Sequence, residues 1–346
     1  MSTYIIGEIG QNHNGSVDIA KLIIDMASRP IKDSLFNKDL QGINAIKFTK
    51  RDLKNEMSNS KMNERYDSPN SFGKTYGEHR KYLELSDDQH LELFNYVKLK
   101  GLDYIITLCS PSCTSILDKL TPNYLKVASR DLTNIPLLEA LAETKIPIIL
   151  STGMSDQNEL DQALNKIERH HSKISILHCI SEYPSRYENI NLNTIRFLKK
   201  NYSKFKIGFS DHSIGISIST SAVALGAEII EKHITLDRKM KGTDQSGSLE
   251  SDGLNRMIRD IRNLEVALGE ELIKVSSSIS ETKIKLKRSI ATKKNLKVGD
   301  QINENDLIMI SPGDGFDWSK KDFLIGKKVV QEVSANEIIY KKHIEK

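Results

Sequence analysis

Eight short apolar runs recur along this chain and alternate with longer segments of helical periodicity. Such runs, bounded by polar turns, are typical of strands buried on both faces of a parallel sheet. Helical patterns fill the intervals, for example Ser16–Ser28, Asp87–Lys100 and Gly253–Leu268. The predicted strands are Tyr4–Gly10, Ala45–Thr49, Asp103–Thr107, Tyr124–Ala128, Pro147–Ser151, Ile174–His178, Lys206–Ser210 and Glu228–His233.

Eight strand–helix repeats in roughly 265 residues match the length and order of a (β/α)8 TIM barrel. An open, doubly wound sheet is the structural alternative, but it rarely reaches eight regular repeats. Two long connections interrupt the pattern, and we assign no role to the first, Arg29–Gly42. The second, Arg51–Leu85, is polar and follows the carboxyl end of its strand, where barrel active sites are built. It is a substrate-facing loop or a plain surface excursion.

The character of the chain changes after Leu268. Residues 269–287 are rich in serine and lysine and predict a linker. From Arg288 onward, short β-like runs alternate with turns, which predicts a separate domain of about 60 residues. We therefore expect a catalytic barrel over residues 1–268 and a small β-rich domain over 288–346. The β-like runs are Ser289–Thr292, Val298–Asp300, Leu307–Ile310 and Lys328–Val330.

The composition excludes several classes of protein. A formal net charge of +4 in 346 residues is too diffuse for a nucleic-acid partner. No apolar stretch is long enough to span a bilayer, and no basic, apolar leader precedes the first strand. The three cysteines, Cys109, Cys113 and Cys179, show no disulfide framework, so we expect reduced thiols and a cytoplasmic protein.

Two histidines, His212 and His233, each follow a predicted strand, and the segment between them is helical. A strand–helix–strand unit of this length makes the strands parallel neighbours, roughly 5 Å apart. Both imidazoles would then project from one edge, within reach of a single Mn²⁺ or Zn²⁺ ion that keeps open positions. The alternative is two unrelated polar residues at strand ends.

Other strand ends also carry ionisable or hydroxyl groups, and these suit a phosphate or carboxylate on the barrel axis. They are Glu8, Lys47, Thr107, Lys126, Ser129, Ser151 and His178. Glu8 could be a general base, a hydrogen-bond acceptor for a ligand hydroxyl or a group that holds a water molecule. We expect His178 to pack in the core or to support the site from behind the residues that touch the ligand. In the segment after Glu8, Asn12, His13 and Asn14 could bind a polyhydroxylated ligand, while Asn14 or Ser16 could cap the next helix.

Several segments together resemble the sialic acid synthase family, in order and along essentially the whole chain. The tail resembles the SAF (antifreeze-like) domain that ends these enzymes. Ser71–Arg80 and Lys241–Glu250 are similar to the branch that contains the animal sialic acid phosphate synthase. The segments that carry the family resemblance are Glu8–Gly15, Lys126–Ser129, Leu150–Met154, His178–Pro184, Gly208–Ser213 and Glu231–Leu236.

The resemblance implies condensation of phosphoenolpyruvate with N-acetylmannosamine or a related N-acyl hexosamine, with or without a 6-phosphate, and release of phosphate. It places Mn²⁺ or Mg²⁺ on His212 and His233, and it places Glu8, Tyr183 and Asp244 near the sugar. It also implies a domain-swapped homodimer. We assign catalysis to Glu8, Lys47 and Lys126. The positions that match phosphoenolpyruvate contacts are Lys47, Thr107, Lys126, Ser129, Ser151 and Ser210.

The chain departs from the family pattern at three places. Ser311 replaces an Arg that many bacterial members carry in the tail, Arg130-Asp131 replaces Gly-Glu, and Ser181 replaces an Asn in the sugar-contacting region. These changes leave legionaminic- and pseudaminic-type products open. Two other classes also remain open: a related barrel enzyme that uses an arabinose or erythrose phosphate, which would lack the tail domain, and a non-catalytic sugar-binding or ice-surface protein.

Overall fold

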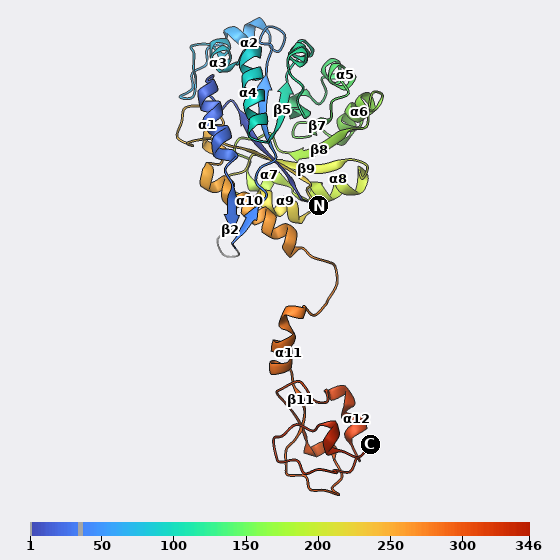
Figure 1. Cartoon of the computed structure of the whole chain (residues 1–346). Coiled ribbons are helices and arrows are strands. Elements are labelled where there is room, and N and C mark those ends of the chain that lie inside the picture. Colours follow the sequence, from blue (N-terminus) through green and yellow to red (C-terminus); the bar gives the residue numbers. More distant parts are fainter. Residues whose placement is uncertain (1, 34–36) are drawn as a thin grey trace. The chain divides into compact units, whose positions relative to one another are not determined.

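Eight parallel strands close into a barrel in the computed structural model, which describes residues 2–33 and 37–346 (Figure 1). The first strand pairs with both the second and the eighth barrel strand, which completes the closure. All eight predicted strands are present, each within one residue of its predicted ends. They are β1 (Tyr4–Gly10), β4 (Ala45–Lys50), β5 (Asp103–Leu108), β6 (Tyr124–Val127), β7 (Ile148–Ser151), β8 (Ile174–Cys179), β9 (Lys206–Asp211) and β10 (Ile229–His233).

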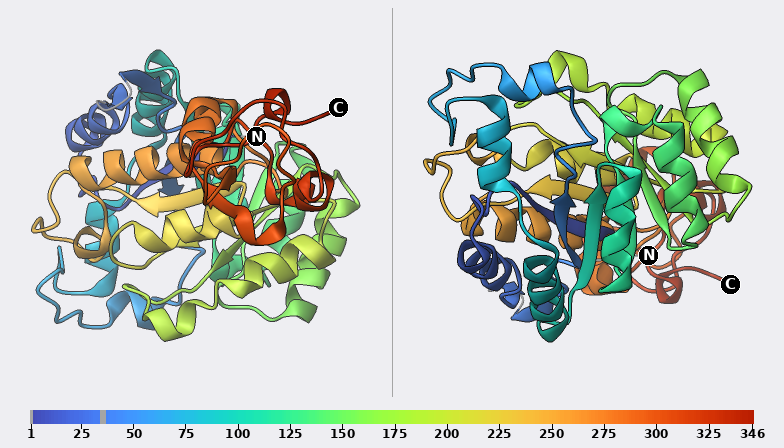
Figure 2. Two further views of the ribbon diagram at one scale, coloured as in Figure 1. Left: turned by 90° about the horizontal axis from the view of Figure 1, so that it is seen from below. Right: turned by 90° about the horizontal axis from the view of Figure 1, so that it is seen from above.

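Helices lie around the strands in two further views of the chain (Figure 2). Ser16 caps α1 by accepting from the Ile19 backbone N–H, and Ser86 and Gln89 form a capping box at α4. After β5 the connection is a 3-10 helix, Pro111–Asp118, instead of an α-helix. The helices of the barrel unit are α1 (Val17–Ala27), α2 (Asn59–Asn63), α3 (Tyr76–Leu83), α4 (Asp87–Leu99), α5 (Ile135–Glu143), α6 (Gln157–Glu168), α7 (Tyr187–Ile190), α8 (Asn193–Asn201), α9 (Ser217–Ala224) and α10 (Ser251–Ala267).

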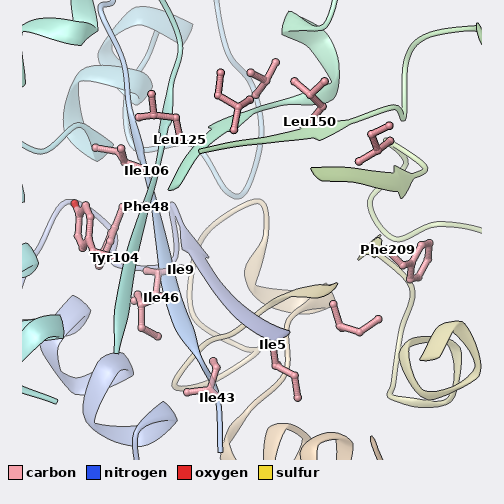
Figure 3. Packing of buried hydrophobic residues seen from close by; sticks show 14 of the residues in the cluster. Ile5, Ile9, Ile43, Ile46, Phe48, Tyr104, Ile106, Leu125, Leu150 and Phe209 are labelled. Atoms are coloured by element: carbon pink, nitrogen blue, oxygen red, sulfur yellow. The ribbon is translucent and has the colours of Figure 1, made fainter. Parts of the chain in front are cut away.

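Alternate residues of each barrel strand face opposite sides, which gives the barrel two apolar layers. The outward set packs against the helices and includes Ile5, Ile46, Phe48 and Tyr104 (Figure 3). A smaller cluster fills the interior. Its buried members are Ile6, Ala45, Ile105, Ile149, Leu177 and Ile229.

The two long connections have structure of their own. The first contains a hairpin of β2 (Ile31–Asp33) and β3 (Lys38–Leu40), and its residues 34–36 lie outside the described residues. The second contains α2 and α3. None of the helices within the described ranges is long and apolar enough to cross a membrane.

The chain divides into two compact units, Met1–Gly269 and Glu270–Lys346. The second unit holds α11 (Ser280–Leu286), β11 (Ser289–Thr292), β12 (Leu307–Ile310) and α12 (Lys321–Leu324) around its own apolar cluster. The end of the segment predicted to be a linker packs on this unit, because the Gly313 backbone N–H donates to the Ile284 carbonyl. The runs at Val298 and Lys328 lie near isolated β-bridges and form no regular strand.

Candidate active site

A ring of mostly polar side chains lies one step above the interior apolar layer. Because side chains alternate along a strand, the residue two positions after each inward residue also points inward. Positions 6, 45, 105, 124, 149, 177, 208 and 229 point inward. The residues two positions after them therefore form the next inward ring, at the carboxyl ends of the strands. Its members are Glu8, Lys47, Thr107, Lys126, Ser151, Cys179, Ser210 and Glu231.

All eight of these side chains line one cavity of about 410 Å³ at the carboxyl end of the barrel. The loops after the strands add the remaining residues of its wall. The structure therefore brings together every residue assigned to catalysis, to the two substrates or to the metal except Ser181, whose hydroxyl lies close to Gly153. The candidates Asn12, His13, Asn14 and His178 are not part of the cavity wall. The predicted residues that line the cavity are Glu8, Lys47, Thr107, Lys126, Ser129, Ser151, Tyr183, Ser210, His212, His233 and Asp244.

Two lysines and two carboxylates form a buried ionic cluster in the ring. Lys47 Nζ lies 2.8 Å from Glu8 Oε2 and 3.7 Å from Glu231 Oε2. Glu231 also accepts a 2.9 Å hydrogen bond from the Ser210 hydroxyl. Lys126 Nζ donates to the Ser151 hydroxyl at 2.6 Å and to the Val127 carbonyl at 2.9 Å. The lysines are thus held in place while still facing the cavity.

Burial and the mutual repulsion of the carboxylates set the protonation of this cluster. Burial raises the pKa of Glu8 to about 7, although Lys47 opposes the shift and Glu231 adds to it. Burial acts in the same direction on Glu231, but Lys47 and Lys126 outweigh it and lower the pKa of that carboxyl. Burial lowers the pKa of Lys126, an effect that Glu231 partly offsets. Glu8 is therefore the carboxyl that can exchange a proton near neutral pH.

The imidazoles of His212 and His233 lie at the ends of the neighbouring strands β9 and β10, with ring centroids 5.5 Å apart. His212 Nδ1 lies 2.7 Å from the Ile180 carbonyl, so this nitrogen donates to the carbonyl, and Nε2 is the nitrogen that remains for a ligand. His233 Nδ1 is buried and has no hydrogen-bond partner among the described residues. Burial lowers the pKa of this imidazole.

Two neighbouring imidazoles, one with an orphaned nitrogen, fit a divalent transition ion. Within the described ranges, no group of three His, Cys, Asp or Glu side chains could complete a closed metal site. An ion on this pair would keep positions for water or substrate, as catalytic sites do.

Sequence reasoning missed several residues of the cavity wall. Cys179 and Glu231 follow from the alternation along β8 and β10. Arg51, Arg80 and Arg130 come from connections, where the sequence carries no such rule.

The polar residues after Glu8 were partly misjudged, because Asn12 and His13 do not face a ligand. The Asn12 amide donates to the Ile234 carbonyl and the Ser248 hydroxyl, and His13 Nδ1 accepts from the Gly15 backbone N–H. Both side chains are buried and brace the loop.

The NeuB family model matches residues 38–272, and the SAF domain model matches residues 287–345. The chain belongs to the NeuB family. It is therefore a member of the sialic acid (nonulosonic acid) synthase family, with a TIM barrel followed by a SAF domain. The match of the SAF model argues against the alternative of a barrel enzyme that lacks a tail domain.

Relatives of this NeuB family member are named as synthases. It is 34% identical to the N-acetylneuraminate-9-phosphate synthase of Homo sapiens over 97% of this chain and 91% of the relative. It is 32% identical to the N,N'-diacetyllegionaminic acid synthase of Legionella pneumophila over 100% and 95% of the two chains. A solved N-acetylneuraminic acid synthetase from Leptospira borgpetersenii, in complex with citrate, matches with a TM-score of 0.68 at 32% identity over 82% and 90%.

Proposed function

We propose that this protein condenses phosphoenolpyruvate with N-acetylmannosamine or a related N-acyl hexosamine to give a sialic-type acid and phosphate. One observation carries the proposal: a single cavity joins a wall of lysines and hydroxyls to a pair of free imidazoles. The first wall suits the two anionic groups of phosphoenolpyruvate, and the second suits a metal-bound aldehyde. The names of the relatives support the same reaction class.

The lysine wall orients phosphoenolpyruvate and neutralises it. Lys47 and Lys126 supply charge in a buried setting, where ion pairs with phosphate and carboxylate are strong. Thr107, Ser129, Ser151 and Ser210 offer hydroxyl donors around them. This arrangement holds C3 of the enol toward the aldehyde carbon, so that proximity lowers the barrier to C–C bond formation.

The reaction forms a bond between C3 of phosphoenolpyruvate and the aldehyde carbon. Water then adds at C2, and the C2–O bond to phosphate breaks. Glu8 exchanges the proton that this chemistry requires, because its pKa lies near neutrality while Glu231 stays charged. Glu231 fixes Lys47 and Ser210 by ion pairing and hydrogen bonding.

The histidine pair would hold the divalent ion, and imidazole ligands favour Mn²⁺ over Mg²⁺. When bound, the ion would act as a Lewis acid toward the aldehyde oxygen of the acceptor. We also propose that the protein acts as a homodimer, as the family resemblance implies. Sedimentation of the full chain tests this, and a monomer at working concentrations would refute it.

The decisive experiment follows phosphate release from phosphoenolpyruvate in the presence of Mn²⁺. The purified protein is offered a panel of N-acyl hexosamines with and without a 6-phosphate, and a 2,4-diacetamido-6-deoxy hexose of the legionaminic type. Release that requires both phosphoenolpyruvate and one acceptor supports the proposal. The Lys126→Met variant should abolish release, and silence of the wild-type protein across the panel would refute the proposed function.

A further inference from the structure

Arg80 is a half-buried arginine on α3 and lines the wall of the cavity. Its Nη1 donates to the Gln11 side-chain oxygen at 2.6 Å, and its Nε donates to the Tyr76 hydroxyl at 2.7 Å. The guanidinium also lies over the Tyr76 ring, 4.9 Å from its centroid. These neutral contacts fix the side chain and leave its charge uncompensated.

The other two arginines of the cavity wall are compensated by carboxylates. Arg51 forms an ion pair with Glu56. Arg130 lies 3.7 Å from Glu56 and 3.4 Å from Asp131. In the part of the chain that the structure describes, no carboxylate forms an ion pair with Arg80. A fixed guanidinium without a counter-ion in a binding cavity is a preformed site for an anionic group of a ligand.

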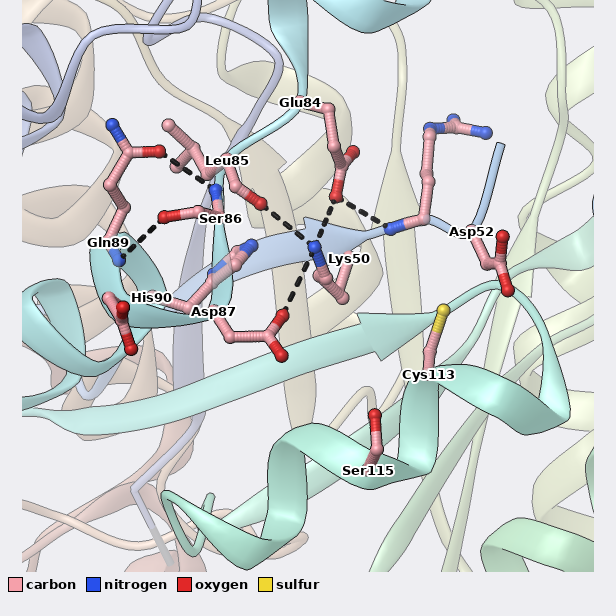
Figure 4. Close-up of polar contacts among 12 residues, drawn as sticks. Lys50, Asp52, Glu84, Leu85, Ser86, Asp87, Gln89, His90, Cys113 and Ser115 are labelled. Carbon is pink, nitrogen blue, oxygen red and sulfur yellow. Dashed lines mark hydrogen bonds and ion pairs between the residues drawn. The ribbon is translucent and has the colours of Figure 1, made fainter. Parts of the chain in front are cut away.

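The helix that carries Arg80 is anchored at its end to barrel strand β4. Lys50 Nζ contacts the Glu84 carboxylate at 3.0 Å, the Leu85 carbonyl at 2.9 Å and the Asp87 carboxylate at 3.3 Å (Figure 4). Glu84 also accepts from the Arg51 backbone N–H at 3.1 Å. Arg80 therefore lies on a helix whose end is held against the barrel.

The contacts of Arg80 place it on the imidazole side of the cavity. Gln11, which accepts from Arg80, donates in turn to Asp244 Oδ2 at 3.4 Å. Asp244 lines a small recess together with His212 and His233. The charges of phosphoenolpyruvate are already matched by Lys47, Lys126 and their hydroxyl neighbours, which come from the ring of strand ends. The anion that Arg80 would bind therefore belongs to the other substrate.

We propose that Arg80 binds a phosphate monoester on the acceptor sugar and makes the protein selective for a 6-phosphorylated N-acyl hexosamine. The proposal rests on the proposed function. The Nη2 group has no hydrogen bond to the described residues, and together with the second Nη1–H it can donate to two oxygens of one phosphate. The neutral partners Gln11 and Tyr76 suit a cation that must remain available to a ligand.

The test compares N-acetylmannosamine with its 6-phosphate as acceptors, using the full-length protein, Mn²⁺ and phosphoenolpyruvate. The wild-type protein should show a kcat/KM at least tenfold higher for the phosphorylated sugar. Arg80→Gln should raise the KM for the phosphorylated sugar by about 10- to 100-fold, the range expected for a lost hydrogen bond to a charged group. It should lower the kcat/KM for the unphosphorylated sugar much less than that for the phosphorylated sugar, and Arg80→Lys should recover part of the loss.

Lys81→Gln is the matched control, since it removes the same charge from the next, exposed residue of α3. It should leave all kinetic constants unchanged. An equal or better kcat/KM for the unphosphorylated sugar would overturn the inference, and so would an equal loss on both acceptors in Arg80→Gln. In either case the wild-type protein still releases phosphate from phosphoenolpyruvate with at least one acceptor. Failure of this inference is therefore distinguishable from failure of the proposed function, in which no acceptor supports phosphate release.

Discussion

A buried ion pair on the outer face of the barrel supports the two imidazoles. Asp211 and Lys232 immediately precede His212 and His233, and their carboxylate and ammonium lie 2.9 Å apart with at most 1% exposure. Asp211 also accepts from the Ser219 hydroxyl on α9 and from the Ser213 backbone N–H. Lys232 donates to the Ser213 carbonyl. The network ties β9, β10 and α9 together.

Replacement of Asp211 by Asn should lower the stability of the barrel strongly. The variant keeps most of the packing but leaves the Lys232 ammonium buried without its counter-ion. Breaking a buried pair in this way costs about 3–5 kcal/mol. In a domain of this size that corresponds to a fall in Tm of about 6–20 °C. The double variant Asp211→Asn/Lys232→Met should be less destabilised than Asp211→Asn, because no buried charge remains.

Circular dichroism in the far ultraviolet measures the unfolding of the barrel. The single tryptophan, Trp318, lies in the second unit, so its fluorescence reports that unit separately and should not change. The matched control is Asp252→Asn, which breaks an exposed pair with Arg256 and should cost less than about 1 kcal/mol. An Asp211→Asn variant no less stable than this control would refute the reasoning.

Three further predictions follow from the same geometry. Burial lowers the pKa of His90 to about 3. Between pH ~6.5 and 5 this imidazole therefore takes up a proton only in the unfolded chain, which favours unfolding as the pH falls. The free energy of unfolding of the barrel should decrease by about 2 kcal/mol over this range because of His90 alone. The free energy of unfolding, measured with urea at several pH values, should fall less steeply with falling pH in His90→Gln than in the wild-type protein. The same pH dependence in both proteins would contradict the prediction. Gly153→Ala places a Cβ 2.6 Å from the Ser181 hydroxyl and 2.9 Å from the Ser129 hydroxyl, and the displacement of these hydroxyls should raise the KM for phosphoenolpyruvate severalfold. Gly42→Ala, which meets no described atom within 4 Å, should leave this KM unchanged; equal KM values for the two variants would count against a role of these hydroxyls. Chelation should abolish turnover and added Mn²⁺ should restore it, while His233→Ala should lose Mn²⁺ binding by calorimetry with its circular dichroism intact; near-normal Mn²⁺ affinity in that variant would exclude the histidine site.

The fold could be predicted closely because each barrel strand is a short apolar run, and burial on both faces leaves little ambiguity in its ends. The same runs placed Lys47, Lys126 and the histidine pair at one edge. Glu231 could have been found as well, since it lies two residues before His233 and shares its face.

The rest of the cavity depends on connections that no periodicity describes. Arg80 is held at the wall by Gln11 and Tyr76, and Lys50 of β4 holds the end of its helix. The sequence suggests Asn12 and His13 as ligand contacts. In the structure the Asn12 amide donates to the Ile234 carbonyl, and the His13 imidazole accepts from the Gly15 backbone N–H. Such assignments depend on tertiary contacts between segments far apart in the chain.

The Ile180 carbonyl that orients His212 belongs to the same loop as Tyr183, whose ring lies 4.0 Å from that imidazole. The conformation of this loop and the orientation of the imidazole are therefore coupled. A sequence change that reshapes this loop to admit a different sugar also turns the ring beside it, so new specificity there comes at the expense of turnover. The part of the wall that α3 supplies is free of this linkage, because Lys50 of β4 holds the end of α3 and, among the described residues, α3 forms no hydrogen bond or ring contact with His212 or His233. Evolution, or an engineer, can exchange side chains on α3 and alter the choice of acceptor while the reacting centre stays as it is.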